Sequence, residues 1–591
     1  MKKSTWTRYF AFVFFTALCF YGGSSLIAAE EADADNDGIP DSVEVAQGYD
    51  PATPTRIIYV DCTRSDDSGD GLSEATAKRS IRAGVDAAKI ADVENVVIVA
   101  PGIYTGPDNR EINFGGYNIK LRSKRGSPET IVDLQRQGIF LYVKSHESKE
   151  NTWLDGFTIK NGQGQYNGGA VEVSNSSGLT VKNCVFSDNR VGGSGGALYA
   201  YNSNVDVFNT RFFNNHYKQN EDSGYPESGG GAIYFGSGTY NVSNSEFLNN
   251  SATNGGAINL SEGTLNLTSC AFRNNMATYG GVLYMYYSGT VNLTNCLVLN
   301  NSANYYGFMN CGYGSNVTIT NSTILNSVSK SGADLYIDGT LNMYNSIFNG
   351  NHTGTPAEIA YSCTTQDCSA LGTGNISADP QVTAAGYLKV NSPCIDTGSA
   401  DYAPEKDYAG QSRPVGSAPD MGCFEFLDSD SDGIPDCVEI AAGMNPNDAS
   451  DASGDADNDG LTNLQEFQSG TNPGKADSDD DGIADGVELA QGYDPIFYTL
   501  MVYVDPSKSD DSGDGLTQAT AKKTIKAAVE MCSKTLENVI MLMPGTYSGE
   551  NNRNFDLDGF NIKIRSTAGA ATTIIDLEGA ARFIYLRNGT R

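Results

Sequence analysis

The stretch Gly255–Tyr279, GGAINLSEGTLNLTSCAFRNNMATY, is one unit of the repeat that decides the fold. Its Gly-Gly-Ala start, or Gly-Gly-Val in the last copy, occurs at Gly168, Gly195, Gly230, Gly255 and Gly280, in steps of 27, 35, 25 and 25 residues. Repeats of this length are typical of solenoids, in which each unit buries its apolar face only against its neighbours.

Apolar side chains recur at alternate positions when the units are aligned. One predicted inward column contains Val171, Leu198, Ile233, Ile258, Leu283 and Met309, and the next contains Val173, Ala200, Phe235, Leu260, Met285 and Cys311. This period of two indicates strands. Three short strands in about 25 residues predict an all-β protein, a right-handed parallel β-helix whose turns lie about 4.8 Å apart.

Each unit also contains a Phe-x-x-Asn signature, whose asparagines are Asn189, Asn215, Asn250, Asn275, Asn301 and Asn351. An asparagine stacked on its equivalents can form hydrogen bonds to the turns above and below and tolerates turn geometry. We therefore expect this column to be structural.

Gly-Gly-Ala combined with Phe-x-x-Asn resembles the repeats of chlamydial polymorphic outer-membrane proteins and, more broadly, the pectin-lyase-like β-helix superfamily. The resemblance covers residues 57–426. It implies that residues 59–88 form an entry rung and an amphipathic helix that covers the open end of the solenoid, and that residues 379–426 form a closing segment.

Four twelve-residue segments carry acidic or amide side chains at positions 1, 3, 5, 9 and 12, with glycine at position 6. A hard divalent cation prefers six to eight oxygen ligands, and such a loop supplies them. The predicted metal ligands are Asp33, Asp35, Asp37, Asp41, Glu44, Asp428, Asp430, Asp432, Asp436, Glu439, Asp455, Asp457, Asp459, Asn463, Glu466, Asp477, Asp479, Asp481, Asp485 and Glu488.

Every final glutamate is followed four residues later by glycine and then by x-Asp-Pro or x-Asn-Pro, which indicates a short helix ended by a left-handed glycine. These segments resemble bacterial relatives of the thrombospondin type 3 calcium repeat, which implies Ca²⁺ as the cofactor. An ordinary acidic linker would not keep this register four times. We expect one repeat at residues 30–51 and three at 427–496.

The start of the chain recurs near its end. Asp33–Glu44 corresponds to Asp477–Glu488, and Ser65–Gly71 corresponds to Ser509–Gly515, both shifted by 444 positions. Residues 497–591 therefore predict the first turns of a second, incomplete β-helix. We expect the sequence to be a fragment of a longer array; the alternative is a tail that needs a partner.

Charge and the leader restrict the location and the partners. With 39 basic and 71 acidic side chains the formal net charge is -32, which argues against nucleic acid as a partner. Basic residues, an apolar run and Ala28-Ala29 predict a secretory signal at residues 1–29, although the run is also long enough for a retained membrane anchor. We expect a secreted or cell-surface protein without a membrane span after removal of the signal.

The outward column beside the Gly-Gly-Ala strand is rich in tyrosine. Tyrosine rings can stack on sugars and amides can bind sugar hydroxyls, but tyrosine is also a good strand former on an exposed pleat. The candidate ligand-binding residues are Glu172, Tyr199, Tyr201, Tyr234, Asn259, Tyr284 and Tyr286.

Two functions remain open at this point. The columns show no cluster of Lys, Arg or Asp on the outer face, whereas a polysaccharide lyase needs a base and cations and a hydrolase needs paired carboxylates. This pattern favours an elongated adhesin or scaffold that binds a polysaccharide, a cell-surface glycan or a protein. The alternative is a polysaccharide-degrading lyase or hydrolase.

Overall fold

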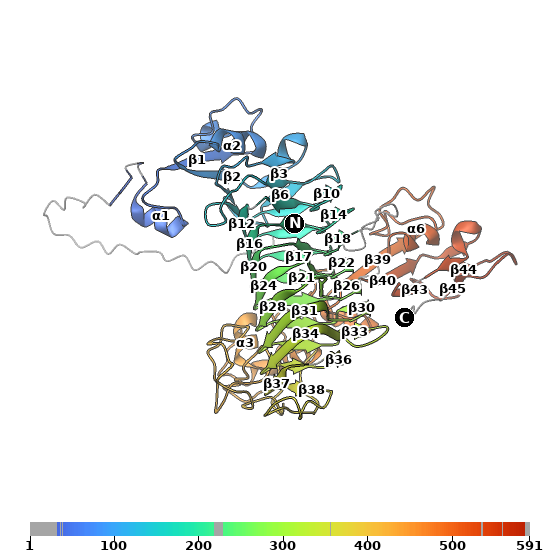
Figure 1. Cartoon of the computed structure of the whole chain (residues 1–591). Helices are drawn as coiled ribbons and strands as arrows, with labels where there is room; N and C mark the ends of the chain where they lie inside the picture. The colour runs from blue at the N-terminus through green and yellow to red at the C-terminus, as the bar shows by residue number, and fades with distance from the viewer. Residues whose placement is uncertain are drawn as a thin grey trace, which may run out of the picture. The chain divides into compact units, whose positions relative to one another are not determined.

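The computed structural model describes residues 32–585, apart from 36, 38, 176, 218–228, 355, 533–535 and 558–559 (Figure 1). The predicted secretory signal at 1–29 therefore lies outside the described residues. The chain forms two compact units, residues 1–55 and 56–591, and each is described by itself.

The larger unit contains a parallel β-helix, as predicted. Its largest sheet has 20 strands in two adjoining columns that merge in two long strands, β31 (Met309–Thr320) and β34 (Leu335–Tyr344). The first column contains β4 (Ile112–Asn113), β7 (Leu141–Val143), β11 (Val171–Ser174), β15 (Leu198–Tyr201), β19 (Ile233–Phe235), β23 (Ile258–Leu260), β27 (Leu283–Met285) and β36 (His352–Thr353). The second contains β1 (Thr55–Val60), β2 (Glu94–Val99), β5 (Ile119–Ser123), β8 (Trp153–Asp155), β12 (Gly178–Lys182), β16 (Asn204–Phe208), β20 (Thr239–Ser243), β24 (Gly263–Thr268), β28 (Gly289–Thr294) and β37 (Glu358–Ala360).

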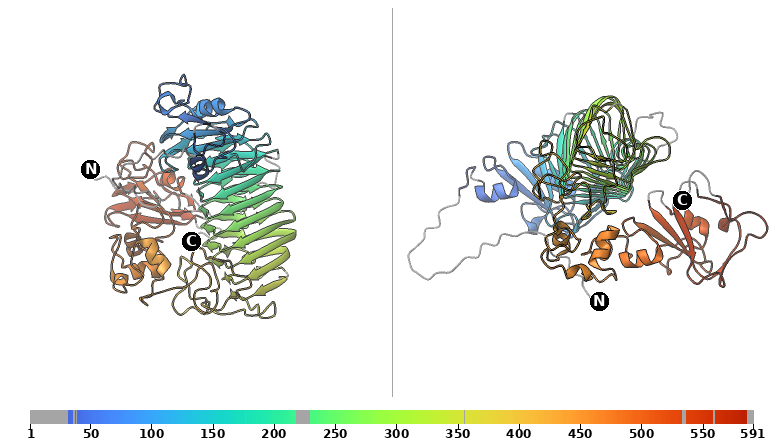
Figure 2. Two further views of the ribbon diagram at one scale, coloured as in Figure 1. Left: turned by 90° about the vertical axis from the view of Figure 1, so that its left-hand side faces the viewer. Right: turned by 90° about the horizontal axis from the view of Figure 1, so that it is seen from below.

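Two further sheets complete the turns, and Figure 2 shows the strands of successive turns stacked on one another. The 11-stranded sheet contains β3 (Gly102–Tyr104), β6 (Thr130–Asp133), β9 (Thr158–Lys160), β13 (Val185–Ser187), β17 (Arg211–Phe213), β21 (Glu246–Leu248), β25 (Ala271–Arg273), β29 (Leu297–Leu299), β32 (Thr323–Leu325), β35 (Ile347–Phe348) and β38 (Cys363–Thr364). The 7-stranded sheet contains β10 (Gln163–Gly164), β14 (Arg190–Val191), β18 (His216–Tyr217), β22 (Ser251–Asn254), β26 (Met276–Tyr279), β30 (Ser302–Tyr305) and β33 (Val328–Ser329).

The predicted register is confirmed, but the predicted number of strands per turn is too low. Val171 pairs with Leu198, which pairs with Ile233, and the same column continues through Ile258 to Leu283. The middle turns have four strands where the sequence predicted three, because the residues after the Phe-x-x-Asn asparagine also pair with the next turn, as in β22 and β26.

The two glycines of Gly-Gly-Ala have different reasons to be glycine. The first adopts a left-handed conformation, with φ of 65° at Gly255 and 66° at Gly280, which side chains with a Cβ rarely adopt. The second lies against the next turn: a Cβ on Gly231 would come within 2.0 Å of the Gly256 carbonyl oxygen. Successive turns can therefore approach closely at this corner only where the second position is glycine.

Side chains inside the solenoid form continuous stacks. Phe212 stacks on Phe247 at 4.9 Å and Phe247 on Phe272 at 4.8 Å between ring centroids. Asn250 donates from Nδ2 to Asn275 Oδ1 at 3.0 Å, and its Oδ1 accepts from Asn215 Nδ2 at 3.0 Å. The asparagine stack runs from Asn189 to Asn301 and is fully buried, as expected for a structural column.

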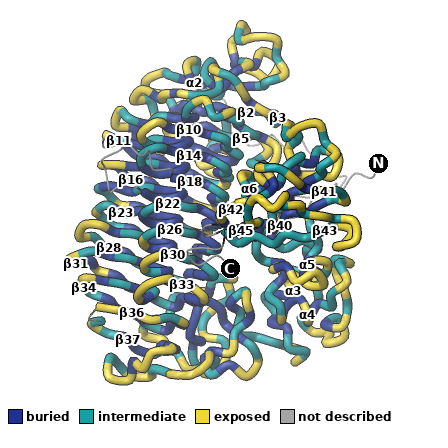
Figure 3. Tube along the Cα trace, turned by 90° about the vertical axis from the view of Figure 1, so that its right-hand side faces the viewer, coloured by how far each residue is buried: buried dark blue, intermediate teal, exposed yellow. Residues whose placement is uncertain are grey.

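Asn351 does not extend this stack. It is exposed, and its backbone N–H donates to the Asp334 carboxylate at 3.1 Å. Figure 3 shows buried residues along the stacked strands and most exposed residues in the connecting loops.

A short helix and a long irregular segment pack against the β-helix. Helix α2 (Ile81–Ala88), with the turns η1 (Glu74–Thr76) and η2 (Pro107–Asn109) around it, packs Ile81 and Val85 into the same core as Val97. Near the other end of the β-helix, Met421 and Phe424 belong to a cluster with outward side chains of β29 and β32. The closing segment therefore covers the outside of the 11-stranded sheet.

The remaining elements belong to the acidic repeats and to the second copy. The repeats contain α1 (Asp41–Gln47), α3 (Asp436–Ala442), η3 (Asp451–Ser453), α4 (Asn463–Ser469) and α5 (Asp485–Gln491). The second copy contains β39 (Thr499–Val504), α6 (Ile525–Val529), β40 (Glu537–Leu542), β41 (Gly545–Tyr547), η4 (Glu550–Asn552), β42 (Phe555–Asp556), β43 (Ile562–Ser566), β44 (Thr573–Ile575) and β45 (Ile584–Tyr585).

Candidate calcium centres and outer tyrosine face

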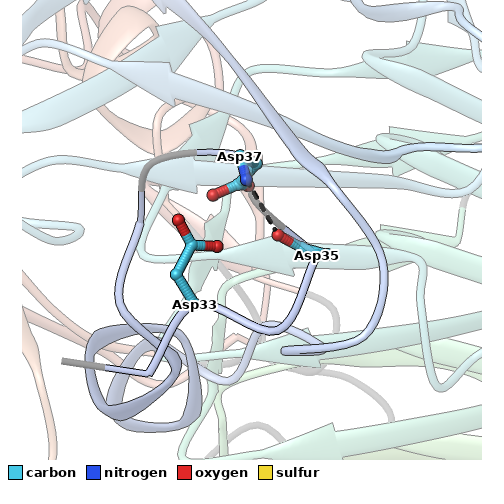
Figure 4. A group of neighbouring side chains, drawn as sticks. All are labelled: Asp33, Asp35 and Asp37. Carbon is cyan, nitrogen blue, oxygen red and sulfur yellow. Dashed lines mark hydrogen bonds between the residues drawn. The ribbon is translucent and has the colours of Figure 1, made fainter. Parts of the chain in front are cut away.

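Each acidic loop is folded by hydrogen bonds from its own backbone to its aspartates. In the first loop the Asp37 N–H donates to Asp35 Oδ1 at 3.1 Å and the Ile39 N–H donates to Asp37 Oδ1 at 2.7 Å. Figure 4 shows the carboxylates of Asp33, Asp35 and Asp37 turned toward a common space. The fold of the loop therefore brings like charges together, an arrangement that a cation would stabilise.

The acidic groups lie close enough to share an ion. One carboxylate oxygen from each aspartate at positions 1, 3 and 5 lies within 4.8 Å of the other two in the loops beginning at Asp33, Asp428 and Asp455. The glutamates at position 12, which are Glu44, Glu439, Glu466 and Glu488, are all fully buried.

Many of these buried oxygens have no hydrogen-bond partner among the described residues. Both carboxylate oxygens of Glu439, Glu466 and Glu488 are in this state, as is one oxygen of the position-3 side chain in each loop. A buried carboxylate without a partner is costly unless a cation or a proton neutralises it. An all-oxygen donor set of this kind fits Ca²⁺.

The pKa values reflect the same crowding. Burial, followed by repulsion from Asp430 and Asp432, raises the pKa of Glu439 to about 8. Burial raises the pKa of Glu466 to about 8 and that of Glu488 to about 9, with neighbouring aspartates adding to both shifts. The free loops therefore hold their carboxylates in an environment that disfavours negative charge.

The residue at position 9 has a bracing contact in every loop. The backbone N–H at position 2 donates to this side chain: Ala34 to Asp41 at 2.7 Å, and Ser429 to Asp436, Ala456 to Asn463 and Ser478 to Asp485 at 2.8, 3.0 and 2.8 Å. Only an acceptor is needed for this bond, which explains why Asn463 can replace aspartate.

Two loops are hydrogen-bonded to the strand that follows them. The Thr55 N–H donates to Asp37 Oδ2 at 2.6 Å, and its hydroxyl donates to Glu44 Oε1 at 3.2 Å. In the second copy the Thr499 N–H donates to Asp481 Oδ2 at 2.7 Å, whereas its hydroxyl donates to the Phe497 carbonyl at 3.5 Å. The first residue of β1 and of β39 therefore contacts the predicted ligand at position 5 in both copies, and Thr55 also contacts the one at position 12. The sequence showed this threonine in both copies, but its partners became visible only in the structure.

The predicted tyrosine face is only partly available to a ligand. The rings of Tyr199 and Tyr234 stack on each other at 5.1 Å, so each covers one face of the other. Tyr201 and Tyr286 are 45% and 41% exposed. Tyr284 is half-buried, with its ring centroid 6.4 Å from that of Tyr286.

Two members of the predicted binding face are occupied or covered. Asn259 is only 1% exposed, so its predicted placement on an accessible face was wrong. Its column faces outward, but the segment at Gly229 in the same protein lies against its amide group. Glu172 forms an ion pair with Lys144 at 2.9 Å. Sequence reasoning missed the exposed Tyr279 and Tyr305, which stack at 5.1 Å, because β26 and β30 were not predicted.

The structure also corrects the expected absence of a basic cluster on the outer face. Lys182 Nζ lies 3.5 Å from the Trp153 ring centroid and 3.8 Å from an Asp155 oxygen, and Arg122 Nε lies 3.1 Å from the same carboxylate. These residues lie on β5, β8 and β12, in the second column of the large sheet. The prediction of the outer face covered only the column beside the Gly-Gly-Ala strand. Burial lowers the pKa of Lys182, and Arg122 and Lys120 lower it further against the opposing effect of Asp155.

Comparison with known proteins identifies the acidic segments. The bacterial TSP3 repeat matches residues 33–54, 428–449, 455–476 and 477–496. The chain carries four TSP3 repeats. The Chlamydia polymorphic membrane protein repeat matches residues 183–201, within the β-helix. Both resemblances expected from the sequence are therefore confirmed.

Other comparisons add little about function. No curated protein matches the chain. The structure is similar to a solved structure described as "Crystal structure of pectate lyase Pel9A", with 16% identity, a TM-score of 0.41, and coverage of 67% of this chain and 100% of that chain. Within the described residues, no helix has the length and apolar character required to cross a membrane.

Proposed function

We propose that this protein is a secreted or cell-surface scaffold in which TSP3 repeats bind calcium and stiffen the connection to each β-helix. The observation that carries the proposal is the threonine contact at the start of β1 and of β39. In both copies the backbone N–H of this threonine donates to the carboxylate at position 5 of the preceding loop, and in the first copy its hydroxyl also reaches position 12.

Calcium would act through this contact. The residues that would hold the ion are the side chains at positions 1, 3, 5 and 12, and the ion would supply the positive charge that their buried oxygens lack. A neutralised loop can keep Asp37 and Asp481 ionised and oriented as acceptors for the threonine N–H groups. The first strand of each β-helix is then fixed to its loop at one end.

Hydrogen exchange of the whole chain tests this function. With calcium we expect slow exchange in residues 39–60 and 477–504, and with a chelator we expect faster exchange there and little change in β19 to β29. Equal exchange in the two conditions would refute the calcium-dependent connection. Magnesium at the same concentration serves as a control, because it prefers a smaller octahedral site and keeps its water ligands.

We further propose that the tyrosine face binds a glycan or a protein. The exposed rings of Tyr201, Tyr286, Tyr279 and Tyr305 support a polar and aromatic surface of this kind. Immobilised polysaccharides, both acidic and neutral, should retain the wild-type chain and release a Tyr201→Ser/Tyr286→Ser variant. Retention of both proteins to the same extent would place binding elsewhere.

The Trp153 cluster favours a second candidate, a polysaccharide lyase. In such a reaction a base removes the proton next to a uronate carboxylate, and the bond to the leaving sugar oxygen breaks to give an unsaturated product. Lys182, with its lowered pKa, could serve as the base and Arg122 could bind the carboxylate. Incubation with uronate polysaccharides should then produce ultraviolet absorbance that Lys182→Ala abolishes and Lys160→Ala, in another sheet, preserves. No absorbance with the wild-type chain would leave the scaffold as the working function.

A further inference from the structure

Two acidic side chains lie beside the predicted ligands of a loop to which they do not belong in the sequence. Asp451 lies in η3, outside the two matched repeats 428–449 and 455–476. Asp485 is position 9 of the last loop, at the start of α5. Each has a carboxylate oxygen within 4.8 Å of the acidic ligands of a different loop.

Asp451 faces the loop that precedes it. One of its oxygens accepts the Asn445 N–H at 3.0 Å, whereas the other is buried and has no hydrogen-bond partner. This side chain forms a close group with Asp432 and Glu439, positions 5 and 12 of the first loop of the three. The backbone carbonyl of Asp451 also accepts from Asn463 Nδ2 at 2.7 Å, which ties η3 to the next repeat.

Asp485 faces the middle loop. It is fully buried, and it forms a close group with Asp459 and Glu466, positions 5 and 12 of that loop. The next residue strengthens the connection, because the Gly486 N–H donates to Asp459 Oδ2 at 2.7 Å. The third repeat therefore supplies both a donor and a carboxylate to the second.

An independent feature shows that these groups point at a ligand. Glu439 and Glu466 are fully buried, and in the part of the chain that the structure describes both oxygens of each carboxylate lack a hydrogen-bond partner. Three carboxylates packed this closely repel one another unless a cation lies among them. Polar contacts within the described protein do not account for this arrangement.

We propose that Asp451 and Asp485 complete the calcium centres of the loops 428–439 and 455–466, so that the centres form a linked series. This inference rests on the proposed function, namely that the loops bind calcium. The first two centres then each include a carboxylate from the segment that follows, Asp451 or Asp485, and in the last loop the Thr499 N–H holds the ligand Asp481. The middle centre reaches full affinity only when α5 is folded beside it.

Asp485→Asn tests the middle centre. The substitution keeps an acceptor for the Ser478 N–H, as Asn463 does at the same position of its own loop, so the last loop should still fold. Because one charged ligand is lost, calcium titration of the whole chain by calorimetry should show one ion bound about 10- to 100-fold more weakly. Hydrogen exchange in calcium should rise in residues 455–471, although the substitution lies in the neighbouring repeat.

Asp436→Asn is the matched control. Asp436 accepts the Ser429 N–H at 2.8 Å and the Ser429 hydroxyl at 2.6 Å, which are the same two contacts that Ser478 makes with Asp485. We expect any effect of this variant to stay within its own loop, residues 428–439, and the middle centre to keep its wild-type affinity. If the effect of Asp485→Asn likewise stays within its own loop, residues 477–488, the proposal is wrong, while calcium binding by the loops themselves still stands.

Asp451→Asn tests the first centre of the series in the same way. It should lower the affinity for one calcium ion by about 10- to 100-fold and increase hydrogen exchange in residues 428–444. Asp448→Asn is its control, because Asp448 lies three residues away and contacts Ser450. If the Asp451→Asn variant binds calcium with wild-type affinity, Asp451 is not a ligand of this centre. Absence of any calcium binding by the wild-type chain would instead overturn the proposed function itself.

Discussion

The two copies of the opening unit are similar in sequence, but within the described residues stacked turns follow only the first. Leu121 of β5 is fully buried, because β5 pairs with β2 on one side and β8 on the other. Its equivalent in β43, Ile564, is half-buried, and in the described residues β43 pairs with β40 alone.

An ion pair shows the same difference. Lys120 and Glu94 form a pair whose lysine side chain is 3% exposed, whereas the equivalent Lys563, paired with Glu537, is 35% exposed. The comparison teaches that the side chains of one turn of this solenoid become fully buried only when the next turn pairs with it.

The largest effect is expected inside the stacked turns that follow the first copy. Asn250→Ala removes the partners of Phe212 O and of the Asn215 N–H and Nδ2 groups, and these buried groups would lose their hydrogen bonds. We expect a loss of about 3–6 kcal/mol in the free energy of unfolding, from two or three unsatisfied groups. Chemical denaturation of the whole chain measures this loss.

Asn266→Ala is the control for this prediction. Asn266 belongs to a half-buried row, in which it donates to Asn241 Oδ1 at 2.8 Å and accepts from Asn292 Nδ2 at 2.8 Å. Water can replace these bonds, so we expect a loss of less than about 1 kcal/mol. Similar losses in both variants would show that burial of the asparagine stack is unimportant.

The next largest loss of stability is expected when an aspartate that occurs in both copies is replaced. Asp67 accepts the Arg79 and Ser80 N–H groups at 2.7 Å and the Ser80 hydroxyl at 2.8 Å, and Asp511 accepts the equivalent three bonds from Lys523 and Thr524. Substitution by alanine should cost about 2–4 kcal/mol locally in either copy.

Hydrogen exchange can distinguish the two aspartate variants. Asp511→Ala should accelerate exchange through the whole second copy, from β39 to β45, because few contacts hold it. Asp67→Ala should accelerate exchange near α2 only, since the stacked turns hold the rest of the unit. Equal spread of the effect in both copies would contradict the role that we assign to the stacked turns.

Calcium removal should also affect the two copies unequally. At calcium concentrations about 100 times the dissociation constant, one bound ion stabilises the folded state by about 2.7 kcal/mol. Chelation should therefore increase exchange more in β39 than in β1, because β1 is the first strand of a complete solenoid. Limited proteolysis with and without chelator should show cleavage near residue 499 before cleavage near residue 55.

The smallest effect concerns the two threonines. Thr55→Val and Thr499→Val keep the backbone N–H bond to the aspartate; the first removes the hydroxyl bond to Glu44 and the second only a long bond to the Phe497 carbonyl. We expect a loss of about 1 kcal/mol for Thr55→Val in the calcium-bound protein and a smaller loss for Thr499→Val. Thr53→Val, which lacks contact with the loop glutamate and bonds to Asp50, is the control. An unchanged midpoint of calcium-dependent protection in Thr55→Val would mean that the backbone bond alone makes the connection.

The sequence by itself determined the β-helix, its register and the acidic loops. Periodic patterns are local rules: alternation sets which side chains point inward, glycine sets where the chain turns tightly, and the spacing of Asp430, Asp432 and Glu439 sets one loop. Each can be predicted without knowing which segments meet in space.

The tertiary structure alone decided which groups from distant segments meet. Asp451 faces Glu439, Asp485 faces Glu466, and Lys182 lies on Trp153, although no motif relates the members of these pairs. The covering of Asn259 has the same origin, because exposure depends on the neighbouring turn and not on the residue's own strand. The physical reason is that burial and electrostatic contact depend on three-dimensional packing, which joins residues that the repeat pattern treats as independent.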